Sequence, residues 1–304
     1  MSTLFQRVSR FAHKSPRERR LSARHFTRIA LSKIPYLPMR TRLPLGAGGA
    51  THFWWSYVDF MFQSDRKFSD YWGHDLDELC FLWNMLRPEM VVFDVGAHHG
   101  IYSVLAAKRV GSGGRVVAFE PSPAECRRLR LHLRMNAIST VAVEPMALSS
   151  SSGQAEFFRV IDGYKGRSGL RFPLFPDSPS PVEPMRVEVT TLDEYVRKHR
   201  IERLDLMKVD VEGAELEILR GGSRVISTLR PMALCEIWDF VTHPWGHSAR
   251  DVITQLETNG YRWFDFQRGG FLSPHELQNT YGEVKNFLAV PEEKVSVIAD
   301  WIAR

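Results

Sequence analysis

The chain has 304 residues, of which 44% are hydrophobic and 12% aromatic, so it can bury a substantial core. Its net charge of +5 is unevenly placed, because residues 1–42 hold eleven Lys or Arg and one acid. These residues carry 11 − 1 = +10, and the rest of the chain carries 5 − 10 = −5. A basic nucleic-acid-binding face on the body is therefore not expected, and no nucleic-acid partner is predicted.

The sequence gives no sign of a membrane span or a secretion signal. No apolar run approaches the ~18 residues that a span requires, and the N-terminus lacks the uninterrupted apolar core of a signal peptide. Three scattered cysteines (Cys80, Cys126 and Cys235) have no metal-ligand spacing and fit a reducing compartment. We therefore expect a cytoplasmic protein.

The basic N-terminal extension, residues 1–42, contains two short amphipathic patterns. The simpler interpretation is a solvated tail or a helix packed on the body. The alternative is peripheral contact with an anionic membrane at its inner face, since basic amphipathic helices lie on such surfaces.

The predicted elements then alternate along the chain. Residues 43–90 are expected to form a cap and a lead-in helix, on which Glu78 either faces the ligand cleft or, more simply, lies on a solvated face. Strands are predicted at residues 91–95, 115–119, 141–148, 154–159, 186–191, 204–210, 231–237, 261–266 and 286–290, with helices between most of them. This alternation predicts a doubly wound, mostly parallel α/β sheet over residues 91–291, followed by a C-terminal helix or tail at 292–304.

One long segment, residues 159–185, breaks the alternation. It contains three glycines and five prolines without any helical or strand period. A segment of this kind inside a compact domain is usually a functional lid or disordered.

The first predicted strand leads into a glycine turn and a helix. Asp94, Gly96 and Gly100 have the spacing Asp-x-Gly-x-x-x-Gly, which lets the backbone turn tightly and approach a ligand. A dinucleotide pyrophosphate needs a further close glycine, and this chain has His98 there. Glu120 ends the next strand, where a carboxylate accepts hydrogen bonds from ribose hydroxyls. Together the two motifs predict a cofactor that contains adenosine.

Five sequence blocks resemble the FkbM family of S-adenosylmethionine-dependent methyltransferases, over about residues 75–291. The most specific block is Met-Lys-Val-Asp-Val-Glu-Gly-Ala-Glu at residues 207–215; the others are residues 93–97 with Gly100, 119–122, 146–149 and 191–193. The resemblance implies a Rossmann-like class I methyltransferase fold, with seven strands of which the last is antiparallel. It also implies O-methylation of a hydroxyl on a glycan, lipid or natural product. The chain departs from the family at His98, where Asn is more usual.

The resemblance further implies where the cofactor binds. Backbone groups at Gly96 and Ala97 would hold its methionine end, Glu120 its ribose, and Met146 and Ala147 would border its adenine. The full set of expected cofactor residues is Asp94, Gly96, Ala97, Gly100, Glu120, Pro121, Met146 and Ala147.

Methylation of an aliphatic hydroxyl also requires removal of its proton, by a base or with a Lewis-acid metal. Asp210 and Glu236 end strands that we infer to be adjacent, so their carboxylates should converge. His243 and His247 are candidates for carrying the proton away, although a surface or core role is common for single histidines. Glu212 is either a further acid of the site or a group that bonds backbone N–H groups at the next helix. Because no compact metal-ligand motif is present, direct base catalysis is favoured over Mg²⁺, and no metal site is predicted.

Two other functional classes share part of this pattern. A nicotinamide-dependent Rossmann oxidoreductase is disfavoured by His98 and by the block at residues 207–215. A membrane-held, non-enzymatic module with a vestigial pocket is disfavoured by the intact Asp94, Gly96, Gly100 and Glu120.

Overall fold

The computed structural model describes residues 39–45, 49–55, 68–161, 165–175 and 180–303. Most of the predicted N-terminal extension, residues 1–38, and parts of the irregular segment at 162–164 and 176–179 lie outside these ranges. Strands β1 (Met39–Leu45) and β2 (Gly49–Trp55) form an antiparallel two-stranded sheet. The expected domain boundary at residue 42 therefore falls inside a strand.

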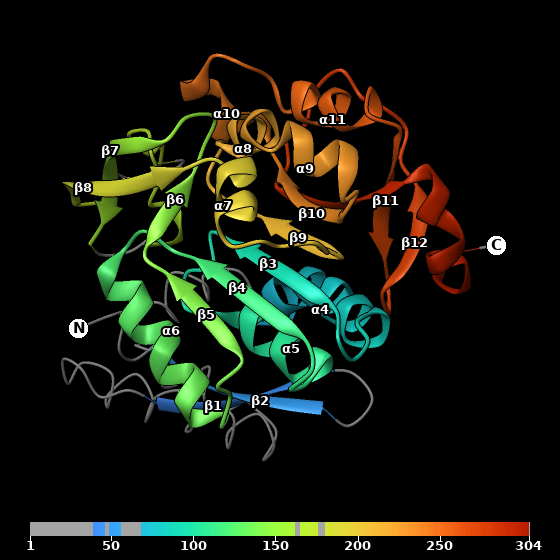
Figure 1. The fold of residues 1–304 in the computed structure, drawn as a ribbon, viewed down its shortest axis with the longest axis horizontal. Helices are drawn as coiled ribbons and strands as arrows, with labels where there is room; N and C mark the ends of the chain where they lie inside the picture. Colours follow the sequence, from blue (N-terminus) through green and yellow to red (C-terminus); the bar gives the residue numbers. More distant parts are fainter. Residues whose placement is uncertain (1–38, 46–48, 56–67, 162–164, 176–179, 304) are drawn as a thin grey trace, which may run out of the picture.

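An eight-stranded sheet forms the centre of the protein, in the order β12-β11-β13-β10-β9-β3-β4-β5 (Figure 1). Its strands are β3 (Val91–Val95), β4 (Arg115–Phe119), β5 (Val141–Glu144), β9 (Leu206–Val209), β10 (Met232–Ile237), β11 (Tyr261–Gln267), β12 (Phe271–Pro274) and β13 (Lys285–Pro291). Strands β5, β4, β3, β9 and β10 pair in parallel in this order, and β13 runs antiparallel to both β10 and β11. The predicted fold class is confirmed, with the last strand antiparallel. Strand β12 is an eighth strand that pairs with β11.

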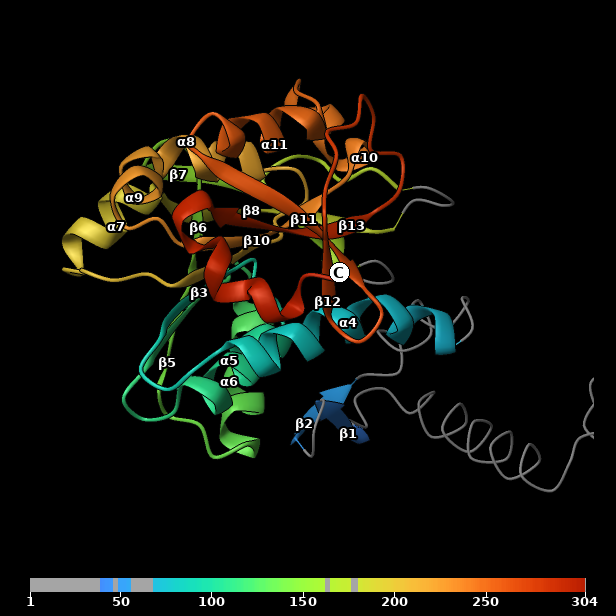
Figure 2. The same cartoon turned by 90° about the vertical axis from the view of Figure 1, so that its right-hand side faces the viewer.

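Helices cover both faces of this sheet (Figures 1 and 2). One face carries α4 (Phe68–Met85), α5 (Ile101–Val110) and α6 (Pro123–Met135); the other carries α7 (Leu192–Lys198), α8 (Glu215–Gly221), α9 (Ser223–Thr228) and α11 (Ala249–Glu257). The 3₁₀ helix η3 (Glu292–Trp301) follows the last strand. Because both faces are covered, the central strands are almost continuously apolar and buried. Among the described helices, none is both long and apolar enough to cross a membrane.

A second, three-stranded sheet lies beside the carboxyl ends of the main strands. It consists of β6 (Met146–Leu148), β7 (Gly153–Val160) and β8 (Val182–Thr190), in the order β6-β8-β7. The expectation of one strand over residues 141–148 was wrong, because β5 ends at Glu144 and β6 pairs with β8 instead. Pro145 separates the two, and proline has no N–H to continue a ladder.

Part of the irregular segment is tied to this small sheet. It begins with the 3₁₀ turn η1 (Lys165–Arg167), and Gly169 then exchanges two backbone hydrogen bonds with Phe158 of β7, at 2.8 and 3.3 Å. Residues 166–170 are thereby held over the carboxyl ends of the main strands.

Candidate functional site

A pocket opens where β3, β4 and β9 end. Six of the predicted site residues line it: Gly96, Glu120, Pro121, Met146, Ala147 and Asp210. Gly166, Ser168, Gly169 and Leu170 of the irregular segment form a further wall. Asp94, Ala97, Gly100, Glu236, His243 and His247 are not among its lining residues.

The turn after β3 requires glycine at position 96 for a steric reason. At Gly96, φ is +77°, and a Cβ atom there would lie 1.8 Å from the backbone oxygen of Asp210. The N–H groups of Gly96 and Ala97 both donate to the backbone oxygen of Phe119, at 3.1 and 3.0 Å. Gly100 serves helix packing instead, since its Cβ would lie 2.0 Å from Leu129 of α6. The turn therefore brings β3 against the loop after β9.

Glu120 is held in place by backbone donors. One carboxylate oxygen accepts the N–H of His98 at 2.9 Å, and the other accepts the N–H of Ser122 at 2.7 Å. Burial raises the pKa of Glu120 to about 8, although these two N–H groups act to lower it. The carboxyl group is thus fixed at the pocket wall and readily changes protonation near neutral pH.

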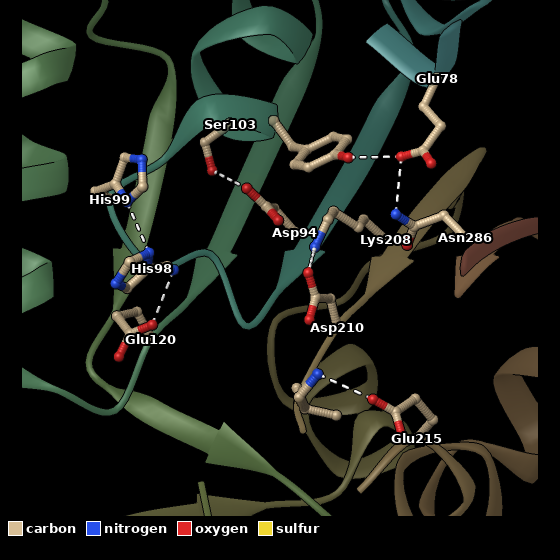
Figure 3. Close-up of polar contacts among 12 residues, drawn as sticks. Glu78, Asp94, His98, His99, Ser103, Glu120, Lys208, Asp210, Glu215 and Asn286 are labelled. Atoms are coloured by element: carbon tan, nitrogen blue, oxygen red, sulfur yellow. Dashed lines mark hydrogen bonds and ion pairs between the residues drawn. The ribbon is translucent and has the colours of Figure 1, made fainter. Parts of the chain in front are cut away.

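A buried lysine joins the pocket to the interior of the sheet (Figure 3). The Nζ atom of Lys208 lies 2.7 Å from an oxygen of Asp210 and 4.5 Å from the centre of the Tyr102 ring. Burial acts to lower the pKa of Lys208, but Asp210 and Asp94 outweigh it, so the pKa is raised and the ammonium stays charged. Asp94 is itself buried and accepts a 2.5 Å hydrogen bond from the hydroxyl of Ser103. Lys208 therefore supplies the positive charge for two carboxyl groups.

Glu78 extends the same polar chain (Figure 3). Its carboxylate accepts hydrogen bonds from the Tyr102 hydroxyl at 2.8 Å and from the Asn286 side chain at 2.9 Å. The side chain is buried, so the expected solvated position was wrong. The helical period identified α4, but it could not reveal that this face meets Tyr102 of α5 and Asn286 of β13.

Three acids converge beside the pocket. Carboxylate oxygens of Asp210, Glu212 and Glu236 lie within 4.8 Å of one another, and we call these residues the acid cluster. The strand positions of Asp210 and Glu236 correctly indicated this convergence. Burial raises the pKa of Glu212 to about 8, against the opposing effect of Arg167, whose Nη1 lies 3.7 Å away. Burial and the neighbouring acids also raise the pKa of Glu236.

Such a cluster has two chemical uses. Three oxygen ligands can hold a divalent cation, or carboxyl groups with raised pKa can accept a proton near neutral pH. The ammonium of Lys208, bonded to Asp210, already compensates part of the negative charge and so competes with a cation.

The two candidate histidines lie away from the pocket. His243 is exposed in the 3₁₀ turn η2 (His243–Trp245), which follows α10 (Asp239–Thr242). The Nδ1 atom of His247 is 3.2 Å from the backbone oxygen of Ser248. Their proposed part in proton transfer stays a prediction.

A further polar group at the pocket was not predicted from the sequence. The Nδ1 atoms of His98 and His99 are 2.6 Å apart, and Nε2 of His98 is 3.5 Å from an oxygen of Glu125. These three side chains are close enough to share an ion. Arg128 lies 3.5 Å from the same Glu125 oxygen, which places a positive charge where an ion would have to bind. The adjacency of His98 and His99 in the sequence is the pattern that could have indicated this group.

Comparison with known proteins identifies the family. The model of the methyltransferase FkbM domain matches residues 94–263, more than half of the chain. The fold and this match define a methyltransferase of the Rossmann-like class. The chain belongs to the FkbM methyltransferase family.

Three relatives illustrate the similarity. AMB antimetabolite synthetase AmbE of Pseudomonas aeruginosa is 30% identical over 167 residues, 45% of this chain and 8% of AmbE. Methyltransferase sdnD of Sordaria araneosa is 30% identical over 189 residues, 53% of this chain and 71% of sdnD. Hexuronic acid methyltransferase AglP of Haloferax volcanii is 28% identical over 153 residues, 50% of this chain and 58% of AglP. The chain thus spans less than two thirds of AmbE and of AglP.

Proposed function

We propose that the protein transfers a methyl group from S-adenosylmethionine to a hydroxyl of a small-molecule, glycan or lipid acceptor. The charge of the pocket carries this proposal. Glu120, Glu125, Asp210 and Glu212 line it, and none of its described lining residues is Lys or Arg. S-adenosylmethionine bears a sulfonium and an ammonium, which the ionised acids of the lining attract and which favour ionisation of Glu120 and Glu212, whereas the anionic pyrophosphate of a nicotinamide dinucleotide would find no Lys or Arg in the lining. The same charge pattern disfavours the oxidoreductase alternative.

The residues of the pocket fit the parts of this cofactor. The carboxylate of Glu120 accepts the ribose hydroxyls, and Met146 and Phe157 provide apolar surface for the adenine. When bound, S-adenosylmethionine supplies an electrophilic methyl group on sulfur. The acidic wall formed by Asp210 and Glu212 then faces the positively charged end.

The acid cluster supplies the base. Lys208 orients Asp210, and the pKa of Glu212, raised by burial to about 8, suits a group that exchanges a proton near that pH. Burial and the neighbouring acids raise the pKa of Glu236 as well. As the acceptor oxygen bonds to the methyl carbon and the methyl–sulfur bond breaks toward sulfur, the cluster takes the hydroxyl proton. Because the three acids interact strongly, they titrate as a unit. Alignment of oxygen and methyl by the pocket supplies much of the remaining rate.

Two refinements remain part of the proposal. Mg²⁺ bound by the acid cluster would polarise the hydroxyl instead of a carboxylate removing its proton. His243 and His247 would act only after the cluster, in passing the proton to solvent. The charge of Lys208 favours the base over the metal.

Labelled S-adenosylmethionine tests the function. Full-length protein incubated with the methyl-labelled cofactor and fractionated cell extract is expected to label at least one hydroxyl-bearing fraction. Glu120→Ala should lower both cofactor affinity and labelling. Binding of the cofactor without labelling of any fraction would support the non-enzymatic alternative, and tight NADH binding would support the oxidoreductase.

A further inference from the structure

A second, smaller cavity adjoins the cofactor pocket. Glu212 lines both, and so forms part of the wall between them. The irregular segment contributes to both: Gly166, Ser168, Gly169 and Leu170 line the pocket, whereas Arg167 and Arg171 line the second cavity. A molecule in the second cavity would therefore lie next to the acid cluster.

The two arginines of this cavity differ in their partners. Arg167 is 3.7 Å from Glu212 and lies 4.7 Å from the centre of the Trp238 ring, so its charge is largely engaged. Arg171 lies 4.6 Å from the centre of the Trp245 ring. Among the described residues, no carboxylate lies within ion-pair distance of Arg171. Its guanidinium therefore offers donors to a ligand.

The ring beneath Arg171 is fixed by its own contacts. The indole N–H of Trp245 points to the backbone oxygen of Glu212, at 3.4 Å. The guanidinium is thus supported on a platform attached to the acid cluster, which reduces the entropy lost when it binds an anion. A guanidinium forms paired hydrogen bonds with the oxygens of a carboxylate or a phosphate.

We propose that the acceptor is an anionic carbohydrate, a sugar acid or a sugar phosphate, whose oxyanion binds Arg171 while a ring hydroxyl reaches the acid cluster. This inference rests on the proposed function and names its substrate class. Three neighbouring carboxyl groups can accept hydrogen bonds from several hydroxyls, which favours a polyhydroxylated molecule over a simple alcohol. The oxyanion must lie on the Arg171 side, because the acids would repel it from the pocket.

Three sugars of the same ring type separate the contribution of the oxyanion to binding from that of the ring hydroxyls. Glucuronate carries a carboxylate, glucose 6-phosphate carries a phosphate, and glucose carries neither. Ligand-observed NMR titrations with the full chain, in the presence of S-adenosylhomocysteine, measure the affinity for each sugar without requiring turnover. Both anionic sugars, or one of them, should bind at least about tenfold more tightly than glucose, the effect expected for a charged hydrogen-bond pair. The tighter of the two identifies the oxyanion as carboxylate or phosphate.

Arg171→Ala should remove this preference and leave glucose binding unchanged, and Arg171→Lys should restore part of it. Arg262→Ala, at an exposed position on β11, is the matched control and should keep the preference. Equal binding of all three sugars, no binding of any, or a preference that survives Arg171→Ala would overturn the inference. Failure to bind S-adenosylhomocysteine would instead count against the proposed function, because the sugar titrations can be repeated without it.

Discussion

Glu120 gives the proposed cofactor site a measurable pH dependence. Burial raises its pKa to about 8, so the carboxyl group is mostly protonated at pH 6 before the cofactor binds. Ribose hydroxyls donate to the carboxylate form and so favour it. Binding therefore releases a proton below pH 8, and the affinity should increase as the pH rises toward 8 and then become constant.

The expected size follows from the same pKa. Each pH unit below 8 adds about 1.4 kcal/mol to the free energy of ionising Glu120 before the ribose can bind. The affinity should thus change by about tenfold per unit well below pH 8, and by less near it. At pH 8, where the carboxylate is half formed, Glu120→Ala should weaken binding by ~1.5–3 kcal/mol, the range for a charged hydrogen-bond partner.

Calorimetric titration of S-adenosylhomocysteine between pH 6 and 8 measures this effect. Two buffers with different ionisation enthalpies report the number of protons released. Glu120→Gln keeps an oxygen acceptor but cannot ionise, so its affinity should vary little over this range and proton release should fall. If the unchanged protein shows no pH dependence, or if Glu120→Gln shows the same dependence, the assigned role of Glu120 is wrong.

Three further predictions concern the neighbouring groups. Lys208→Met removes the cation that compensates Asp210 and Asp94, and should lower the free energy of unfolding by about 3–5 kcal/mol in urea denaturation; near-normal stability would show that the acids need no such cation. Glu215→Ala leaves the N–H groups of Val211 and Gly213 without their acceptor, and should lower that free energy by about 1–3 kcal/mol, whereas no loss would mean that other groups replace the carboxylate. Chelator treatment should leave methyl transfer unchanged if the cluster acts as a base; loss of activity that Mg²⁺ restores would favour the metal instead.

Much of the main sheet was predictable from sequence because its signals are local. Buried parallel strands are short apolar runs, and the turn containing Gly96 and the acid at Glu120 follow their strands directly. The break between β5 and β6 was also signalled locally, by Pro145, but an apolar pattern on both sides of it concealed the break.

The contacts within the site were less predictable because they join distant residues. The proximity of Asp210 and Glu236 followed from strand adjacency, but the buried position of Glu78 depends on α5 and β13. The segment that contains Arg171 has no period, and its placement depends on a bridge to β7. Sequence patterns reveal which residues end a strand, but they do not reveal which side chains of a loop face the site.

Asp210→Asn provides the most direct test of the central claim, that this pocket transfers a methyl group to a hydroxyl with the acid cluster as base. The measurement compares labelling of cell-extract fractions by the variant and the unchanged protein, together with affinity for S-adenosylhomocysteine. Labelling should nearly disappear while the affinity stays within a few fold, because the lost interaction acts mainly in the transition state. Near-normal labelling by Asp210→Asn would contradict this claim.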